Sequence, residues 1–105
     1  MNTIRQLQNA YPCKSIWFMV EEESRDDFFQ EIQNLGITFR NGAKPERKDI
    51  GPFLAVNDDN TIAFVSAFIF GKVHDGYERS LRKNTILVSY RKLIAGESTI
   101  MKDCR

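Results

Sequence analysis

The sequence has few of the residues on which enzyme mechanisms depend. Its 105 residues include one histidine, His74, so a mechanism that needs one imidazole as acid and a second as base is excluded. The six glycines are scattered singly and form neither a phosphate-binding loop nor a dinucleotide fingerprint. No serine lies in a nucleophile-elbow context. We therefore predict no catalytic residue, no cofactor and no bound metal.

Cysteine and long apolar runs are also scarce. The two cysteines, Cys13 and Cys104, form no metal-ligand spacing, and the simplest interpretation is two reduced thiols. A disulfide that joins them stays open as an alternative. No window is long and apolar enough to span a membrane, and the N-terminal residues contain no long apolar stretch. We predict a cytoplasmic protein that does not enter the membrane.

Strong net charge is missing as well. The formal net charge is +1, which excludes a polyanion that imitates nucleic acid and a polycation that binds it indiscriminately. The apolar fraction of 42% and the aromatic fraction of 11% are typical of a globular protein. A chain of this length can bury a modest core without metals or disulfides. We predict one domain that covers residues 1–105.

The first third of the chain predicts two helices and a strand. Ile4, Leu7 and Tyr11 share one face of a short helix that ends at Pro12. Residues 15–20 are continuously apolar after Ser15, which indicates a strand covered on both faces.

A second helix follows the strand. Ser24 and Asp27 have the spacing of a capping box, and Phe28 and Ile32 lie on one apolar stripe. Gly36 supplies the left-handed residue that ends this helix.

The rest of the chain predicts strands. Residues 37–40 alternate as in a half-buried strand, and residues 42–51 form an exposed loop. Residues 53–56 and 61–71 flank a four-residue turn at 57–60, which predicts a hairpin whose second arm is a central strand. Residues 72–84 are polar and irregular, residues 85–90 form a last strand, and Gly96 breaks the tail. The predicted fold is an α+β domain with a mainly antiparallel sheet of four to five strands and one or two helices on one face.

The charges are unevenly distributed, and they provide the candidate sites. Carboxylates crowd the start of the second helix, where the helix dipole and capping explain them structurally and where they can also form a protein-binding face. The basic loop that follows is the second part of this predicted surface. Its residues are Glu22, Glu23, Asp26, Asp27, Arg40, Lys44, Arg47 and Lys48.

Two other hypotheses stay open. Basic residues interleaved with tyrosines are typical of a surface that binds nucleic acid or a nucleotide, and an ordinary solvated face has the same composition. The residues of this alternative are Tyr77, Arg79, Arg82, Lys83, Tyr90 and Arg91. The other alternative is a small hydrolase or nuclease in which His74 acts as a single base beside Tyr77 and Arg79.

Residues 16–65 resemble small accessory proteins encoded by phages and prophages. The resemblance rests on the strand, the acidic helix with Phe28 and Phe29, the segment 36–42 and the hairpin turn at 57–60, and it covers about half of the chain. It implies a protein that acts by binding a host or defence component in the host cytoplasm, as inhibitors of bacterial nucleases do. It transfers no catalytic residue. A homodimer formed through an open sheet edge is a further possibility.

Overall fold

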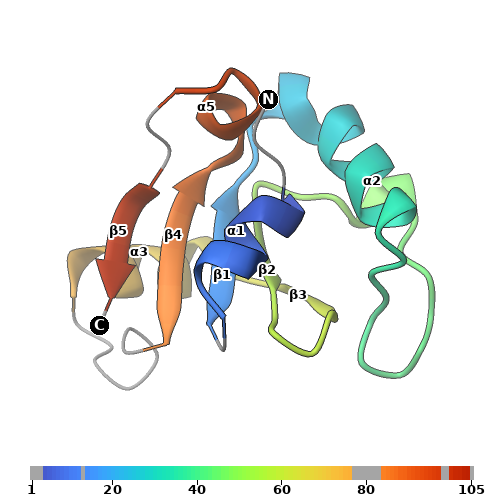
Figure 1. Ribbon diagram of the computed structural model, residues 1–105, viewed down its shortest axis with the longest axis horizontal. Helices are drawn as coiled ribbons and strands as arrows, with labels where there is room; N and C mark the ends of the chain where they lie inside the picture. The colour runs from blue at the N-terminus through green and yellow to red at the C-terminus, as the bar shows by residue number, and fades with distance from the viewer. Residues whose placement is uncertain (1–3, 13, 77–83, 98–99, 105) are drawn as a thin grey trace.

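The computed structural model describes residues 4–12, 14–76, 84–97 and 100–104. It contains a five-stranded sheet in the order β3-β2-β1-β4-β5, with β1 at the centre (Figure 1). The strands are β1 (Ser15–Met19), β2 (Phe53–Val56), β3 (Ile62–Phe64), β4 (Thr85–Ser89) and β5 (Ile100–Cys104). The α-helices are α1 (Ile4–Ala10), α2 (Arg25–Asn34), α3 (Ala67–Asp75) and α5 (Tyr90–Ile94). Two short 3-10 helices cover Glu22–Ser24 and Arg47–Asp49.

The sheet is mixed. β1 pairs with β2 in antiparallel orientation and with β4 in parallel orientation, while β2–β3 and β4–β5 are antiparallel. The parallel pair arises because the chain leaves β3 at one edge and passes through α3 before it enters β4 beside β1. The predicted α+β class and strand number are confirmed, and the largely antiparallel sheet is confirmed with this one parallel pair as the exception.

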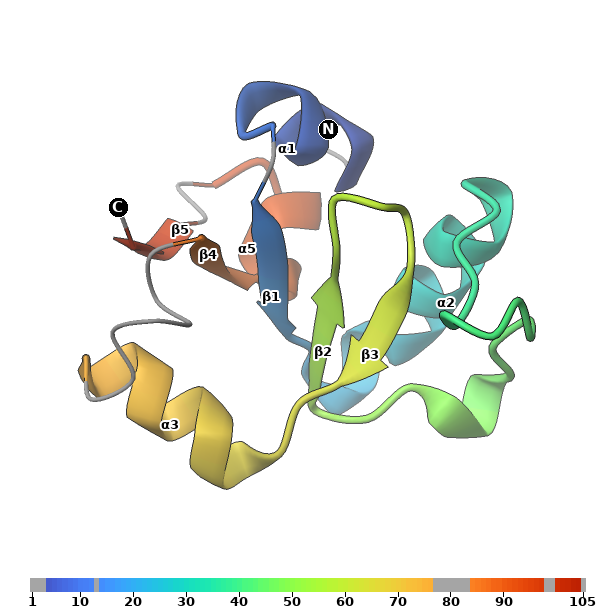
Figure 2. The same cartoon turned by 90° about the horizontal axis from the view of Figure 1, so that it is seen from below.

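Helices cover both faces of the sheet, so the prediction of helices on one face is wrong. Figure 2 shows α1, α2 and α5 on one side of the strands and α3 alone on the other. The alternation along β1 explains the two layers, because Ile16 and Phe18 belong to one buried cluster and Trp17 to the other. The apolar run at 15–20 thus forms a strand with both faces covered, as predicted.

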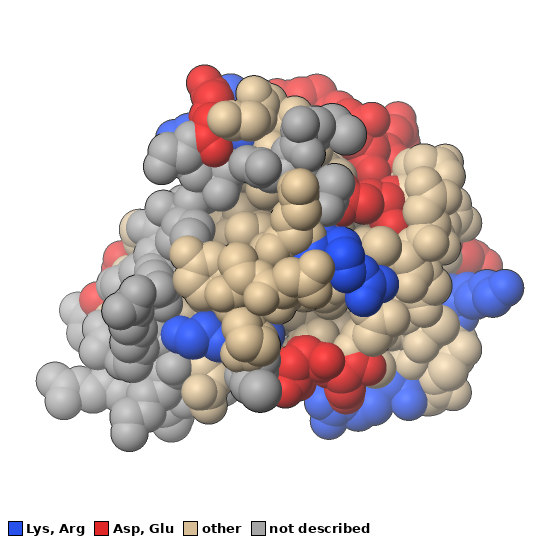
Figure 3. Space-filling view, in the orientation of Figure 1, with Lys and Arg blue, Asp and Glu red and all other residues tan. Residues whose placement is uncertain are grey.

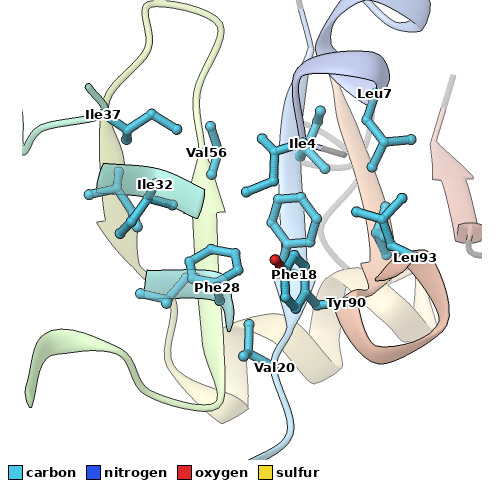
Figure 4. Packing of buried hydrophobic residues seen from close by; sticks show 14 of the residues in the cluster. Ile4, Leu7, Phe18, Val20, Phe28, Ile32, Ile37, Val56, Tyr90 and Leu93 are labelled. Atoms are coloured by element: carbon cyan, nitrogen blue, oxygen red, sulfur yellow. The ribbon is translucent and has the colours of Figure 1, made fainter. Parts of the chain in front are cut away.

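The larger core lies between the sheet and the helices α1, α2 and α5. Phe18, Phe28 and Tyr90 meet at its centre in edge-to-face contacts, with ring centroids 5.0 to 5.8 Å apart (Figure 4). Ile4 and Leu7 of α1 and the α2 stripe pack around these rings, so the predicted inward faces of both helices are confirmed. Edge-to-face packing of this kind adds stability beyond area burial.

The long strand predicted over residues 61–71 is wrong. β3 stops at Phe64 and lies at the sheet edge rather than at its centre, although the hairpin with β2 is confirmed. Ser66 then caps α3, since its hydroxyl accepts the backbone N–H of Ile69 at 3.1 Å. Phe70 and Val73 are three residues apart and face the sheet together. α3 also extends into the segment predicted to be irregular from residue 72 onward.

Three smaller predictions near α2 differ in outcome. Gly36 has φ +69° and ends the helix region as predicted. The Ser24–Asp27 capping box does not form, because Ser24 already lies in a 3-10 turn at φ −104° and ψ 0° and makes no side-chain cap. Residues 37–40 form no strand among the described residues, only an isolated bridge between Thr38 and Thr61.

The tail contains an element that was not predicted. Gly96 has φ +75° and follows α5, and β5 then pairs with β4 at the second sheet edge. The predicted last strand is confirmed as β4, except that residue 90 begins α5. Cys13 lies outside the described residues, so the two interpretations of the cysteines stay as they were.

Candidate protein-binding surface

The start of α2 presents a cluster of exposed carboxylates. We call Glu22, Glu23, Asp26 and Asp27 the acidic surface. All four side chains are exposed, because the helix turns Phe28 and Ile32 inward and leaves its first turn toward solvent. Figure 3 shows carboxylates gathered at the upper right of the molecule, over this part of the chain. The four carboxylates therefore lie together on the surface at the start of α2.

Part of the negative charge is neutralised within the molecule. Arg47 donates to Asp26, so this residue of the 40–48 loop lies beside the helix start. Beside the patch, Arg91 Nε donates to Glu21 at 3.1 Å. Within residues 4–12, 14–76 and 84–97, Glu22, Glu23 and Asp27 have no ion-pair partner. The patch keeps a local excess of negative charge.

Hydrogen bonding favours the ionised form of Glu23. The pKa of Glu23 lies below its ordinary value, mainly because its carboxylate accepts a hydrogen bond from a backbone N–H. The positive charges of Arg91 and Arg25 act in the same direction. The Glu21 partner likewise raises the pKa of Arg91. Glu23 and Arg91 therefore carry full charges at neutral pH.

The loop residues divide between the acidic surface and other places. Arg40 reaches the β2–β3 turn, where its guanidinium lies 3.7 Å from Asp59. Lys48 pairs with Glu46 at 3.1 Å, and this pairing raises the pKa of Lys48. Lys44 is exposed beside the end of α2. Among the predicted basic residues, Arg47 is the one that joins the acidic surface directly.

The nucleic-acid alternative has little support from the described residues. Tyr77, Arg79, Arg82 and Lys83 all lie outside them. Tyr90 is 1% exposed, so its ring is part of the core and is not placed to stack on a base.

The last residue of that alternative, Arg91, is exposed but bonded to Glu21. The structure therefore places Tyr90 and Arg91 in roles that the pattern of tyrosines and cations did not indicate.

For the alternative in which His74 acts as a base, the structure describes Asp75 as a neighbour of the imidazole. His74 is exposed near the end of α3, with Nδ1 3.6 Å from Asp75 Oδ1. The two residues proposed to act with it, Tyr77 and Arg79, lie outside the described residues. In the described part of the chain, no group of three or more His, Cys, Asp or Glu side chains is arranged to hold a metal ion.

The sequence analysis missed a partly buried carboxylate network around Glu31. The Tyr90 hydroxyl donates to Glu31 Oε1 at 2.8 Å, and the backbone N–H of Ile4 donates to Glu31 Oε2 at 2.5 Å. Burial raises the pKa of Tyr90 above its ordinary value, and the hydrogen bond to Glu31 adds to the effect. Glu31 thus joins α1, α2 and α5. No sequence signal relates residues that lie 27 and 59 positions apart.

No family model matches the chain, and no curated protein or solved structure is significantly similar to it. Across the helices that the structure describes, none has the length and apolar character needed to cross a membrane.

Proposed function

We propose that this protein acts by binding another protein through its acidic surface, and that the partner presents a basic patch. The observation that carries this proposal is the set of exposed carboxylates at Glu22, Glu23 and Asp27, which have no ion-pair partner within the described residues. Charges of one sign on a rigid helix start steer an oppositely charged partner and suppress wrong ones. A helix built on a packed core also presents these charges at low entropic cost.

The partner that we propose is a host or defence protein that handles nucleic acid, such as a bacterial nuclease. Two arguments support this class. An enzyme that binds nucleic acid carries Lys and Arg for the phosphates, and those side chains complement the acidic surface. The resemblance of residues 16–65 to phage and prophage accessory proteins implies the same kind of target. In this proposal the protein is a non-enzymatic inhibitor or modulator.

The test is affinity capture from bacterial lysate with the tagged protein, with and without nuclease treatment, followed by mass spectrometry. We expect a stoichiometric protein partner that survives nuclease and dissociates as salt is raised, because opposite charges are screened. Recovery that collapses on nuclease treatment would instead favour the nucleic-acid alternative and contradict the proposal.

A pair of matched variants locates the contact. Glu22→Gln with Glu23→Gln removes two negative charges from the acidic surface, and we expect affinity for the captured partner to fall by roughly tenfold or more. Asp58→Asn with Asp75→Asn removes the same charge from the β2–β3 turn and from α3, and should leave affinity unchanged. Equal losses in both variants would show that overall charge, not the acidic surface, governs binding.

A further inference from the structure

A hollow on the α3 face of the sheet lies outside every site considered so far. Its volume is about 580 Å³, which is within the range of sites for small molecules. The floor is a row of side chains that face each other across adjacent strands, from Trp17 on β1 to Ala55 on β2 and Ala63 on β3. The small side chains of Ala55 and Ala63 beside the large indole of Trp17 leave space over the strands.

The walls of the hollow combine apolar and neutral polar groups. Ile69 of α3 closes one side, and Ser15, Asn57 and Asn84 lie toward the strand ends. Among the described lining residues there is no ionisable side chain. The described lining residues therefore offer no partner to a charged ligand, and removing such a charge from water costs free energy.

The polar side chains are oriented before any ligand arrives. The Ser15 hydroxyl donates to Asn57 Oδ1 at 3.0 Å, and Asn57 Nδ2 donates to Thr61 Oγ1 at 3.2 Å. These bonds hold the Asn57 amide in place while one lone pair and one N–H remain for a ligand. A side-chain amide held in this way can pair with the donor–acceptor edge of a heterocycle, as Asn does with adenine.

From this geometry we propose that the hollow binds an uncharged aromatic heterocycle with an amide-like edge. The flat ring lies over the methyl groups of Ala55 and Ala63, with one edge against Trp17 and its polar edge toward Asn57. Flat rings suit this floor because two paired alanines leave a shallow space beside a large indole. The proposed protein-binding surface belongs to α2 on the opposite face of the sheet, so the two sites are separate in space.

The chain contains one tryptophan, so Trp17 fluorescence reports directly on the hollow. Adenosine and thymidine serve as uncharged purine and pyrimidine probes, and at least one should give a saturable change. AMP tests the charge argument and should bind no more tightly than adenosine. No saturable change with either nucleoside would overturn the proposal, as would AMP that binds tenfold more tightly than adenosine.

A filled variant and a matched control locate the site. Ala63→Leu places three extra carbons in the hollow and should weaken nucleoside binding at least tenfold, whereas Ala10→Leu makes the same change at the exposed end of α1 and should have no effect. Unchanged affinity in Ala63→Leu would overturn the assignment.

Amide chemical shifts of the unaltered chain give the same answer if that variant does not fold. Changes in the amide chemical shifts of Ala55, Ala63 and Ile69 on addition of nucleoside support the proposal. Changes confined to α1 or α2 overturn it. The Glu22→Gln/Glu23→Gln variant should bind nucleoside normally, so this test and the test of protein binding can fail separately.

Discussion

The two faces of the sheet are built from the same strands but packed in different ways. On the face of α1, α2 and α5, three aromatic rings meet edge to face and a carboxylate joins three helices. On the other face α3 is the one helix among the described residues, and the buried cluster that they form there contains Trp17, Ala55, Phe70, Val73 and Leu87. The first face has the larger buried cluster, and the hollow lies on the second.

The largest expected effect is the loss of a ring from the first face. Phe18 is fully buried and contacts both Phe28 and Tyr90, so Phe18→Ala should lower the free energy of unfolding by about 4 kcal/mol, since no neighbour can fill the space. Chemical denaturation followed by circular dichroism measures the loss.

The matched change on the second face is Phe70→Ala. Phe70 stacks on Trp17 and Phe53, but it is 5% exposed on the thinly covered face. Water can enter the space left there, so we expect a loss of about 2 kcal/mol. Equal losses for Phe18→Ala and Phe70→Ala would contradict the contrast between the faces.

The next effect concerns the carboxylate on the first face. Tyr90→Phe leaves Glu31 Oε1 without its donor and should cost about 1.5 kcal/mol. Tyr11→Phe is the control, because Tyr11 is half-buried and makes no side-chain hydrogen bond within the described residues. If Tyr11→Phe lowered the free energy of unfolding as much as Tyr90→Phe, the hydrogen bond between Tyr90 and Glu31 would not be the source of the loss.

Tyr90 also makes the free energy of unfolding depend on pH. The pKa of Tyr90 is raised in the folded protein, so its stabilising contribution is complete below the unfolded value near 10 and is lost as the pH rises above it. The difference in unfolding free energy between the natural chain and Tyr90→Phe should therefore be constant from pH 7 to about 9 and should shrink above about pH 10. A difference that grows above pH 10 would contradict the assignment.

A smaller effect is expected at the helix that covers the second face. Ser66→Ala removes the cap of α3 and should cost about 1 kcal/mol. Ser24→Ala is the comparison, because Ser24 precedes α2 without a capping hydrogen bond, and it should cost clearly less. Thermal unfolding of both variants measures the difference. A larger cost at Ser24 would restore the capping role that its spacing with Asp27 predicted.

The smallest effect is expected on the acidic surface, outside both cores. Arg47→Gln removes the partner of Asp26, and an exposed ion pair of this kind contributes less than about 1 kcal/mol. Stability should stay close to that of the natural chain, while affinity for a basic partner should rise because Asp26 is released. Weaker partner binding would show that Arg47 itself contacts the partner.

Some elements follow directly from the sequence because one pattern alone fits them. Phe28 and Ile32 recur at helical spacing, and an apolar run after Ser15 indicates a strand with two covered faces. Residues 61–71 were mispredicted for the opposite reason, since they are apolar at so many positions that a strand and a helix fit equally well. β5 was missed because Lys102 and Asp103 interrupt its apolar pattern.

The acidic surface was also predicted only in part from the sequence. The sequence places six carboxylates between residues 21 and 31, and that excess alone predicts an acidic helix start. It does not show that Arg47 folds back to Asp26, or that Arg91 reaches Glu21 from 70 residues away. Those pairings decide which carboxylates remain open to a partner.

The sequence by itself determined the class of fold, the faces of α1 and α2, the β2–β3 hairpin and the location of the negative charge, because each follows from neighbours along the chain. The tertiary structure alone decided that β1 and β4 run parallel and that α3, unlike the other described α-helices, lies on the second face of the sheet. It also decided that Tyr90 lies in the core and that Ala55 and Ala63 lie beside Trp17. These features depend on contacts between distant residues, which local periodicity does not encode.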